Sequence, residues 1–184
     1  MSKSPPRPTW TRVRRGEETD HHILRIREDE VEDGRTGKHY PRVRLECPDW
    51  VNVIPVTRAG EIVLVRQFRF GIWQDTLEIP GGMVDEGEAP AHAALRELEE
   101  ETGYRPTREL VSLGSIHPNP AFQSNRCHSF LALDCEQLHA GQPDESEDLE
   151  VVLTPREAIP GLILGGQISH ALVAVAFLLE HYRR

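Results

Sequence analysis

Three glutamates at helical spacing, Glu97, Glu100 and Glu101, constrain this chain more than any other feature. They lie in the segment 89–102, which is rich in Ala, Leu and Glu and predicts a helix that stops at Gly103. Positions i, i+3 and i+4 share one face of a helix, so the three carboxylates would lie together. Like charges there destabilise a helix, whereas Mg²⁺ binds through a few carboxylates plus substrate phosphates. The pattern therefore indicates a site for a hard divalent cation.

A longer pattern surrounds these glutamates. Gly82 is followed after five residues by Glu88 and, after seven more, by the segment Arg96–Tyr104. This spacing resembles the Nudix box of the Nudix hydrolase family without a departure. The alternative, an acidic surface helix with an accidental glutamate cluster, would require a chance match on the order of 10⁻⁸ per window.

The cation site and the resemblance together assign roles to residues. Glu97, Glu100 and Glu101 would hold the metal and act in catalysis, and by resemblance the carbonyl group of Gly81 joins them. Arg96 would orient the carboxylates from outside the metal shell. The structural residues of the box are Gly82, Glu88, Arg96 and Gly103.

A further catalytic base is expected from the acidic loop at residues 141–148. Either Glu145 or Glu147 fits the position that the resemblance implies, and the choice between them stays open. An ordinary solvated acidic loop is the alternative.

Composition limits the partners. The formal charge of −9 argues against a nucleic-acid backbone as the partner, because such proteins carry basic patches. An acidic protein acting on an anionic substrate needs a cation between them, and we expect Mg²⁺ with Mn²⁺ as the alternative. The three cysteines show no CxxC spacing, so neither a disulfide frame nor a zinc site is indicated. No signal-peptide h-region and no transmembrane-length segment is evident, which favours a cytoplasmic protein.

Two β-branched runs, 51–56 and 61–70, predict a hairpin around the turn 57–60. The second run ends with Arg66 and Arg69, whose spacing places them on opposite faces of a strand, so only one would face the site. A guanidinium there suits a diphosphate. Surface charge or an ion pair with Glu78 is the alternative.

Trp73 lies in the loop after this strand. Its ring could stack on a nucleobase, although packing is the alternative for an aromatic residue in a loop.

The N-terminal region, residues 1–47, reads as a tail followed by a β-hairpin of segments 22–31 and 40–47. It is too charged to bury itself, so it should contact the main domain or a second subunit, with a solvated appendage as the alternative. Residues 48–184 would form the Nudix domain. Mixed strands with few helices indicate an α+β fold or an α/β/α sandwich, and the resemblance implies the sandwich with a mixed sheet. A capped helix from Thr154 and an apolar-striped helix over 168–182 complete the domain.

The resemblance extends to the ADP-ribose pyrophosphatase and nucleoside-diphosphate-sugar hydrolase branch of the family. It rests on the segments 65–69 and 76–82, on Pro120 sixteen residues beyond Tyr104, and on the N-terminal hairpin. It implies a homodimer and Mg²⁺-dependent cleavage of the diphosphate of a nucleotide sugar. Residues assigned to the substrate are Arg66, Arg69, Trp73, Glu78 and Pro120.

The branch usually has glycine where this chain has Ala121, so ADP-ribose and other nucleotide sugars stay open as substrates. The alternatives are hydrolysis of dinucleoside polyphosphates, nucleoside triphosphates or coenzyme A, and a non-catalytic nucleotide-sugar sensor.

Overall fold

The computed structural model describes residues 10–142 and 148–183 of the chain. The chain divides into two compact units, Met1–Pro48 with His117–Asn125, and Asp49–Ile116 with Arg126–Arg184. The loop His117–Asn125 joins the first unit because backbone hydrogen bonds connect Leu45 to Phe122 and Ser124.

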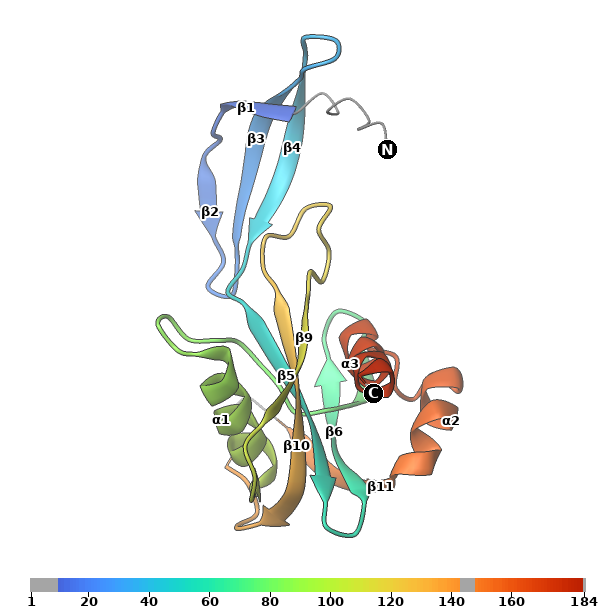
Figure 1. Cartoon of the computed structure of the whole chain (residues 1–184). Coiled ribbons are helices and arrows are strands. Elements are labelled where there is room, and N and C mark those ends of the chain that lie inside the picture. The colour runs from blue at the N-terminus through green and yellow to red at the C-terminus, as the bar shows by residue number, and fades with distance from the viewer. Residues whose placement is uncertain (1–9, 143–147, 184) are drawn as a thin grey trace, which may run out of the picture. The chain divides into compact units, whose positions relative to one another are not determined.

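The first unit is a four-stranded antiparallel sheet (Figure 1). Its strands are β1 (Trp10–Arg14), β2 (Glu18–Asp20), β3 (Arg25–Asp33) and β4 (Lys38–Glu46). β3 pairs with β4 along its whole length, and β1 and β2 share its other edge. The structure thus has the expected hairpin, with Gly37 at a φ of 66° in its turn. It adds β1 and β2, whose residues lack the apolar alternation that would have indicated strands.

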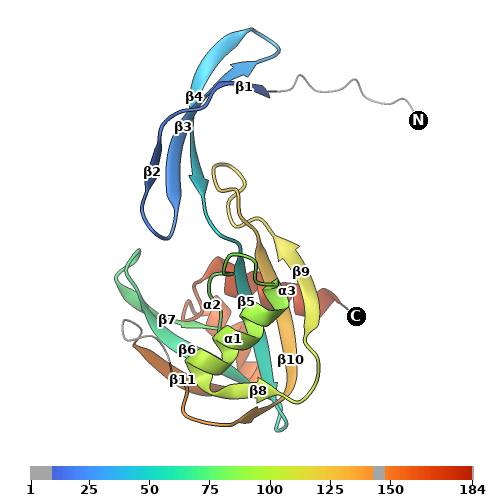
Figure 2. The same cartoon turned by 90° about the vertical axis from the view of Figure 1, so that its left-hand side faces the viewer.

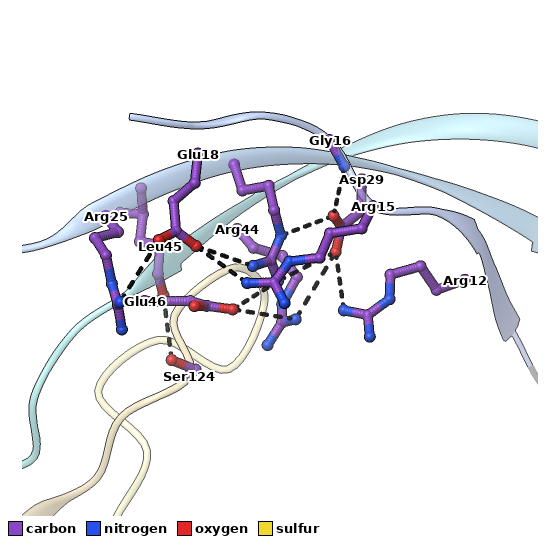
Figure 3. A network of polar contacts seen from close by, with 11 residues as sticks. Arg12, Arg15, Gly16, Glu18, Arg25, Asp29, Arg44, Leu45, Glu46 and Ser124 are labelled. Carbon is purple, nitrogen blue, oxygen red and sulfur yellow. Dashed lines mark hydrogen bonds and ion pairs between the residues drawn. The ribbon is translucent and has the colours of Figure 1, made fainter. Parts of the chain in front are cut away.

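Charged side chains take the place of an apolar core on one face of this sheet. Arg27 and Asp29 are 2% and 1% exposed, and Nε of Arg27 donates to Oδ1 of Asp29 at 2.8 Å. The same guanidinium donates to Glu18 and Glu46, and the backbone N–H of Gly16 donates to Asp29 (Figure 3). Burial raises the pKa of Asp29, but these hydrogen bonds outweigh burial and leave the pKa below its usual range. Burying a charge costs its hydration, and pairing with an opposite charge offsets this cost. The paired charges of this cluster therefore form a polar core.

The second unit is built on a seven-stranded mixed sheet in the order β11–β6–β5–β10–β8, with β7 beside β6 and β9 beside β10. β5 and β10 run parallel, whereas the other pairs are antiparallel. Its strands are β5 (Trp50–Thr57), β6 (Glu61–Arg69), β7 (Gln74–Glu78), β8 (Tyr104–Pro106), β9 (Val111–Ile116), β10 (Cys127–Gln137) and β11 (Leu149–Pro155).

Helices cover both faces of this sheet (Figures 1 and 2). α1 (Pro90–Thr102) lies on one face, and α2 (Ile159–Leu164) and α3 (Ala171–Tyr182) lie on the other. A 3-10 turn, η1 (Arg156–Ala158), leads into α2. The expected α+β sandwich with a mixed sheet is confirmed.

Two apolar cores, one under each helical layer, explain the uninterrupted apolar runs in the sequence. Along β5, Val51 and Val53 belong to the core beneath α1, whereas Ile54 and Val56 belong to the core beneath α3. A strand that is covered on both faces needs apolar side chains at every position rather than at alternate ones.

The expected helix cap at Thr154 is not present. β11 continues through Pro155, and no side-chain hydrogen bond caps the turn that follows. The hydrogen-bonded ladder between β11 and β6 extends to Pro155 and takes Thr154 as a strand residue. The last helix also begins three residues later than predicted, at Ala171, because residues 168–170 form the loop that enters it.

Candidate active site

Helix α1 places the three glutamates of the cation site in environments of decreasing burial. The helix buries Ala93, Ala94, Leu98 and Thr102 against the sheet and ends at Gly103, whose φ of 72° is the left-handed conformation expected there. Glu101, next to this buried face, is 5% exposed. The side chains of Glu97 and Glu100 are 14% and 49% exposed. The face thus grades from the protein interior to the surface, which suits a site that must admit both a cation and a substrate.

The turn Gly81–Gly82 packs directly against two of these carboxylates. The backbone N–H of Gly81 donates to Oε2 of Glu101 at 3.2 Å. A Cβ atom at Gly82 would lie 2.5 Å from Oε1 of Glu97, and one at Gly81 would lie 2.3 Å from the carbonyl oxygen of Val51. Glycine thus allows close approach at both positions, to a side chain at Gly82 and to the backbone of β5 at Gly81.

Arg96 connects the rest of the box. Its guanidinium donates to both carboxylate oxygens of Glu88, to Glu97 at 2.9 Å, to Glu100 at 3.2 Å and to the carbonyl group of Met83. The hydrogen bonds from Arg96 lower the pKa of Glu88, and Glu88 is the main cause of a raised pKa at Arg96. The expected orienting role of Arg96 would use these contacts, and that role stays a prediction. Glu88 also accepts from the backbone N–H of Asp85 and so connects the loop before α1 to Arg96.

The donor set fits a hard divalent cation. Besides the carboxylates, a main-chain oxygen is available, because the carbonyl groups of Pro80 and Gly82 accept hydrogen bonds from Val53 and Val51, whereas that of Gly81 accepts none from the described residues. Within residues 10–142 and 148–183, no three His, Cys, Asp or Glu side chains converge closely enough to enclose a metal ion. Arg96 and the Gly81 N–H hold the carboxylates along the helix instead, so the metal ligation stays a prediction.

A cavity of about 690 Å³ begins at this glycine turn and extends along the sheet on the side of α3. None of the three glutamates lines it; the connection runs through Gly81 and Gly82, which do. Apolar side chains on its wall include Phe68, Phe70 and Ile72. Such a volume, mainly apolar with a few polar groups, is typical of small-molecule sites.

Arg69 and Glu78 form a two-pronged ion pair on the cavity wall. Nε and Nη2 of Arg69 each lie 2.7 Å from a carboxylate oxygen of Glu78, and the hydroxyl of Thr76 donates to the same carboxylate. Burial raises the pKa of Glu78, yet the hydrogen bonds from Arg69 and Thr76 outweigh it and leave the pKa lowered. Nδ1 of His170 lies 3.4 Å from Glu78. The ion pair weighed as an alternative in the sequence does form, and it holds Arg69 at the cavity.

The other predicted substrate residues lie elsewhere. Arg66 pairs with Glu150 of β11 at 2.8 Å, and Trp73 is exposed, with edge contacts to Phe68 and Phe70; neither Arg66 nor Trp73 lines the cavity. Arg69 lines the cavity and Arg66 does not, and the prediction that only one of them faces the substrate stays a prediction. Pro120 belongs to the first unit. Glu145 and Glu147 lie outside the described residues. A substrate role for each of these residues stays a prediction.

Sequence reasoning missed several polar residues of the cavity wall, among them Asn52, Thr76 and His170. Asn52 lies among apolar strand residues, where a polar side chain is a signal of function, whereas Thr76 follows two polar residues at the start of β7 and gave no such signal. His170 carried no signal, because only the fold brings it to Glu78.

Comparison with known proteins decides the family. A family model described as the NUDIX domain matches residues 48–173. The chain belongs to the Nudix family of hydrolases. Enzymes of this family generally use divalent metal ions, in agreement with the donor set of α1.

Relatives cover most of this Nudix protein. It is 34% identical over 154 residues to an ADP-ribose pyrophosphatase of Bacillus subtilis, covering 83% of this chain and 81% of that protein. It is 35% identical over 141 residues to a methanol dehydrogenase activator of Bacillus methanolicus, covering 74% of each. The crystal structure of an ADP compounds hydrolase superposes with a TM-score of 0.83 at 23% identity, covering 98% of this chain and 95% of that one, which shows the shared fold. No helix in the described part of the chain is long and apolar enough to span a membrane.

Proposed function

We propose that this Nudix protein hydrolyses the diphosphate bond of ADP-ribose or a related nucleoside diphosphate sugar in the presence of Mg²⁺, releasing a nucleoside monophosphate and a sugar phosphate. One observation carries the proposal. The Gly81–Gly82 turn contacts Glu97 and Glu101 on one side and forms the end of the cavity on the other. A diphosphate at this turn would have the carboxylate face beside its phosphorus atoms and the cavity for its organic substituent.

Under this proposal, the residues of the site contribute in two ways, by binding the cation that neutralises charge and by holding the reacting groups in position. Hydrolysis of a diphosphate depends on positioning and on neutralising charge more than on covalent catalysis. The bound cation would supply the positive charge and lower the pKa of the attacking water. Glu97, Glu100 and Glu101 would hold it with the Gly81 carbonyl, and Arg96 would keep Glu97 and Glu100 in place.

The cavity wall supports an organic group joined to the diphosphate. The guanidinium of Arg69, fixed by Glu78, presents positive charge that suits phosphate oxygens. Phe68, Phe70 and Ile72 offer an apolar surface for a nucleobase. The relative named ADP-ribose pyrophosphatase favours ADP-ribose among the nucleotide sugars.

Product identification tests this proposal. The protein is incubated with ADP-ribose, GDP-mannose or UDP-glucose in Mg²⁺, and products are separated by ion-exchange chromatography. We expect AMP and ribose 5-phosphate from ADP-ribose, no product after chelation, and product formation slowed by about 100-fold or more with Glu101→Gln. Cleavage of dinucleoside polyphosphates, nucleoside triphosphates or coenzyme A alone would refute the substrate class. Binding of ADP-ribose without turnover would refute hydrolysis and favour the sensor.

The carboxylate of the acidic loop requires its own comparison. Glu145→Gln and Glu147→Gln are a matched pair, two residues apart and identical in chemistry. If one of them is the general base, its variant alone should lose kcat with KM unchanged. Wild-type rates for both variants would remove Glu145 and Glu147 from the reaction.

A further inference from the structure

The cavity contains a polar corner in which the cleavage chemistry leaves the role of His170 unexplained. The corner is formed by Glu78 of β7, Arg69 of β6 and His170, the residue before α3, and Phe68 and Phe70 line the same cavity. Glu78 is 2% exposed and already accepts two hydrogen bonds from Arg69 and one from Thr76, which form its ion pair without His170. His170 therefore does not complete the ion pair, and its position asks for another explanation.

One nitrogen of the His170 ring faces Glu78. Nδ1 lies 3.4 Å from Oε2 of Glu78, whereas Nε2 has no hydrogen bond among the contacts of the described residues. The backbone of His170 is fixed as well, because its carbonyl group accepts from the N–H groups of Val173 and Ala174 at the start of α3. The neighbouring carboxylate favours the proton on Nδ1, which leaves the lone pair on Nε2.

The surroundings of this ring disfavour a positive charge on it. Burial lowers the pKa of His170, the nearby Arg69 lowers it further, and Glu78 only partly compensates. The amino end of α3, where His170 lies, also disfavours a positive charge. The charged groups that face the ring are Glu78 from β7 and Arg69 from β6. A neutral imidazole with its proton on Nδ1 is an acceptor at Nε2 and not a donor.

We propose that His170, oriented by Glu78, determines specificity by accepting a hydrogen bond at Nε2 from a donor on the nucleoside half of the substrate. This inference rests on the proposed function. The donor is either the exocyclic amine of the base or the 2′-hydroxyl of the nucleoside ribose, since both present an N–H or O–H to an acceptor. The nucleoside is the half concerned because Phe68 and Phe70 line the same cavity as His170 and suit a base.

Three analogues test the proposal in steady-state kinetics. ADP-ribose carries both donors, inosine diphosphate ribose lacks the amine, and 2′-deoxy-ADP-ribose lacks the hydroxyl. The variants are His170→Leu, which removes the acceptor, and His170→Gln, which restores one. His181→Leu is the matched control, because His181 lies at the other end of α3 and outside the cavity. Thermal unfolding checks that each variant is folded.

We expect His170→Leu to lower kcat/KM for ADP-ribose by about 10- to 100-fold, the typical effect of an unpaired polar group, mainly through KM. The analogue that lacks the relevant donor should lose little, so the wild-type preference for ADP-ribose over it collapses and identifies the donor. His170→Gln should recover part of the preference. His181→Leu should change nothing.

Two outcomes overturn the proposal. Equal losses on all three substrates would mean that His170 supports the cavity without reading a donor. Unchanged kinetics would mean that it does not meet the substrate. If the wild-type protein cleaves none of the three, the proposed function itself is refuted, which is a distinct result.

Discussion

We expect alanine at Gly82 to lower the activity and alanine at the neighbouring Gly81 to lower the stability of the fold. At Gly82 the new Cβ atom would meet Oε1 of Glu97 at 2.5 Å, so the carboxylate must retreat by about 0.9 Å to reach an ordinary contact of 3.4 Å. These carboxylate atoms lie at the end of the flexible Glu97 side chain, which can move. We therefore expect a change of less than about 1 kcal/mol in the free energy of unfolding. A displacement of about 1 Å in a reacting site costs roughly 100-fold in rate.

The neighbouring position behaves differently. At Gly81 the Cβ atom would meet the carbonyl oxygen of Val51 at 2.3 Å and Cα of Asn52 at 2.8 Å, both backbone atoms of a central strand. Such overpacking costs about 1–3 kcal/mol or more, which lowers the melting temperature of a protein of this size by roughly 2–12 °C. Gly81→Ala should therefore lose stability first, and Gly82→Ala should lose activity first.

The assay measures kcat with ADP-ribose and the melting temperature of each variant. Gly161→Ala is the control, because a Cβ atom there meets nothing within 4 Å. A Gly82→Ala protein with wild-type kcat would show that the position of Glu97 is not critical. Equal destabilisation by Gly81→Ala and Gly82→Ala would refute the distinction between a movable side chain and a fixed strand.

Three further predictions concern Glu101, Glu78 and Leu98. Glu101→Gln keeps an oxygen that can accept from Gly81, so it should retain the melting temperature while kcat falls by about 100-fold or more. The lowered pKa of Glu78 means that its contribution to stability is present above pH 4.5 and is lost as the pH falls through its folded-state value. Urea unfolding should accordingly show a smaller loss below pH 4.5 in Glu78→Gln than in the wild type. Leu98→Ala, at a position 0% exposed, should lower the free energy of unfolding by about 2–5 kcal/mol in the same assay.

The parts of the fold that depend on local sequence signals, such as helix-ending and turn residues, could be predicted from the sequence. The helix of the glutamates ends at Gly103 as expected, because a left-handed residue there is easiest for glycine. The hairpin of β3 and β4 follows from its turn residues and extended flanks. Strand β1 could not be found this way, since ion pairs such as Arg12 with Asp29 hold it and leave no apolar periodicity.

The candidate site likewise has one part that the sequence predicts and one part that only the fold brings together. The carboxylate face of α1 is a property of one helix, so its spacing was visible in the sequence. The polar corner of the cavity is a property of the fold, since β6, β7 and the first turn of α3 must meet before His170 reaches Glu78. No local sequence pattern marks His170; it was found because the structure places it 3.4 Å from the buried carboxylate of Glu78.

The pair Arg69–Glu78 shows why two readings of a sequence need not exclude one another. An ion pair and a phosphate clamp were alternatives for Arg69, and the structure contains the ion pair on the wall of the cavity. Burying a carboxylate in this way adds little net stability, because the loss of hydration offsets much of the attraction. Its effect is instead on position, since two hydrogen bonds of 2.7 Å fix the plane of the guanidinium. A guanidinium held in one plane suits recognition of a diphosphate, so under the proposed function the ion pair would support the clamp rather than compete with it.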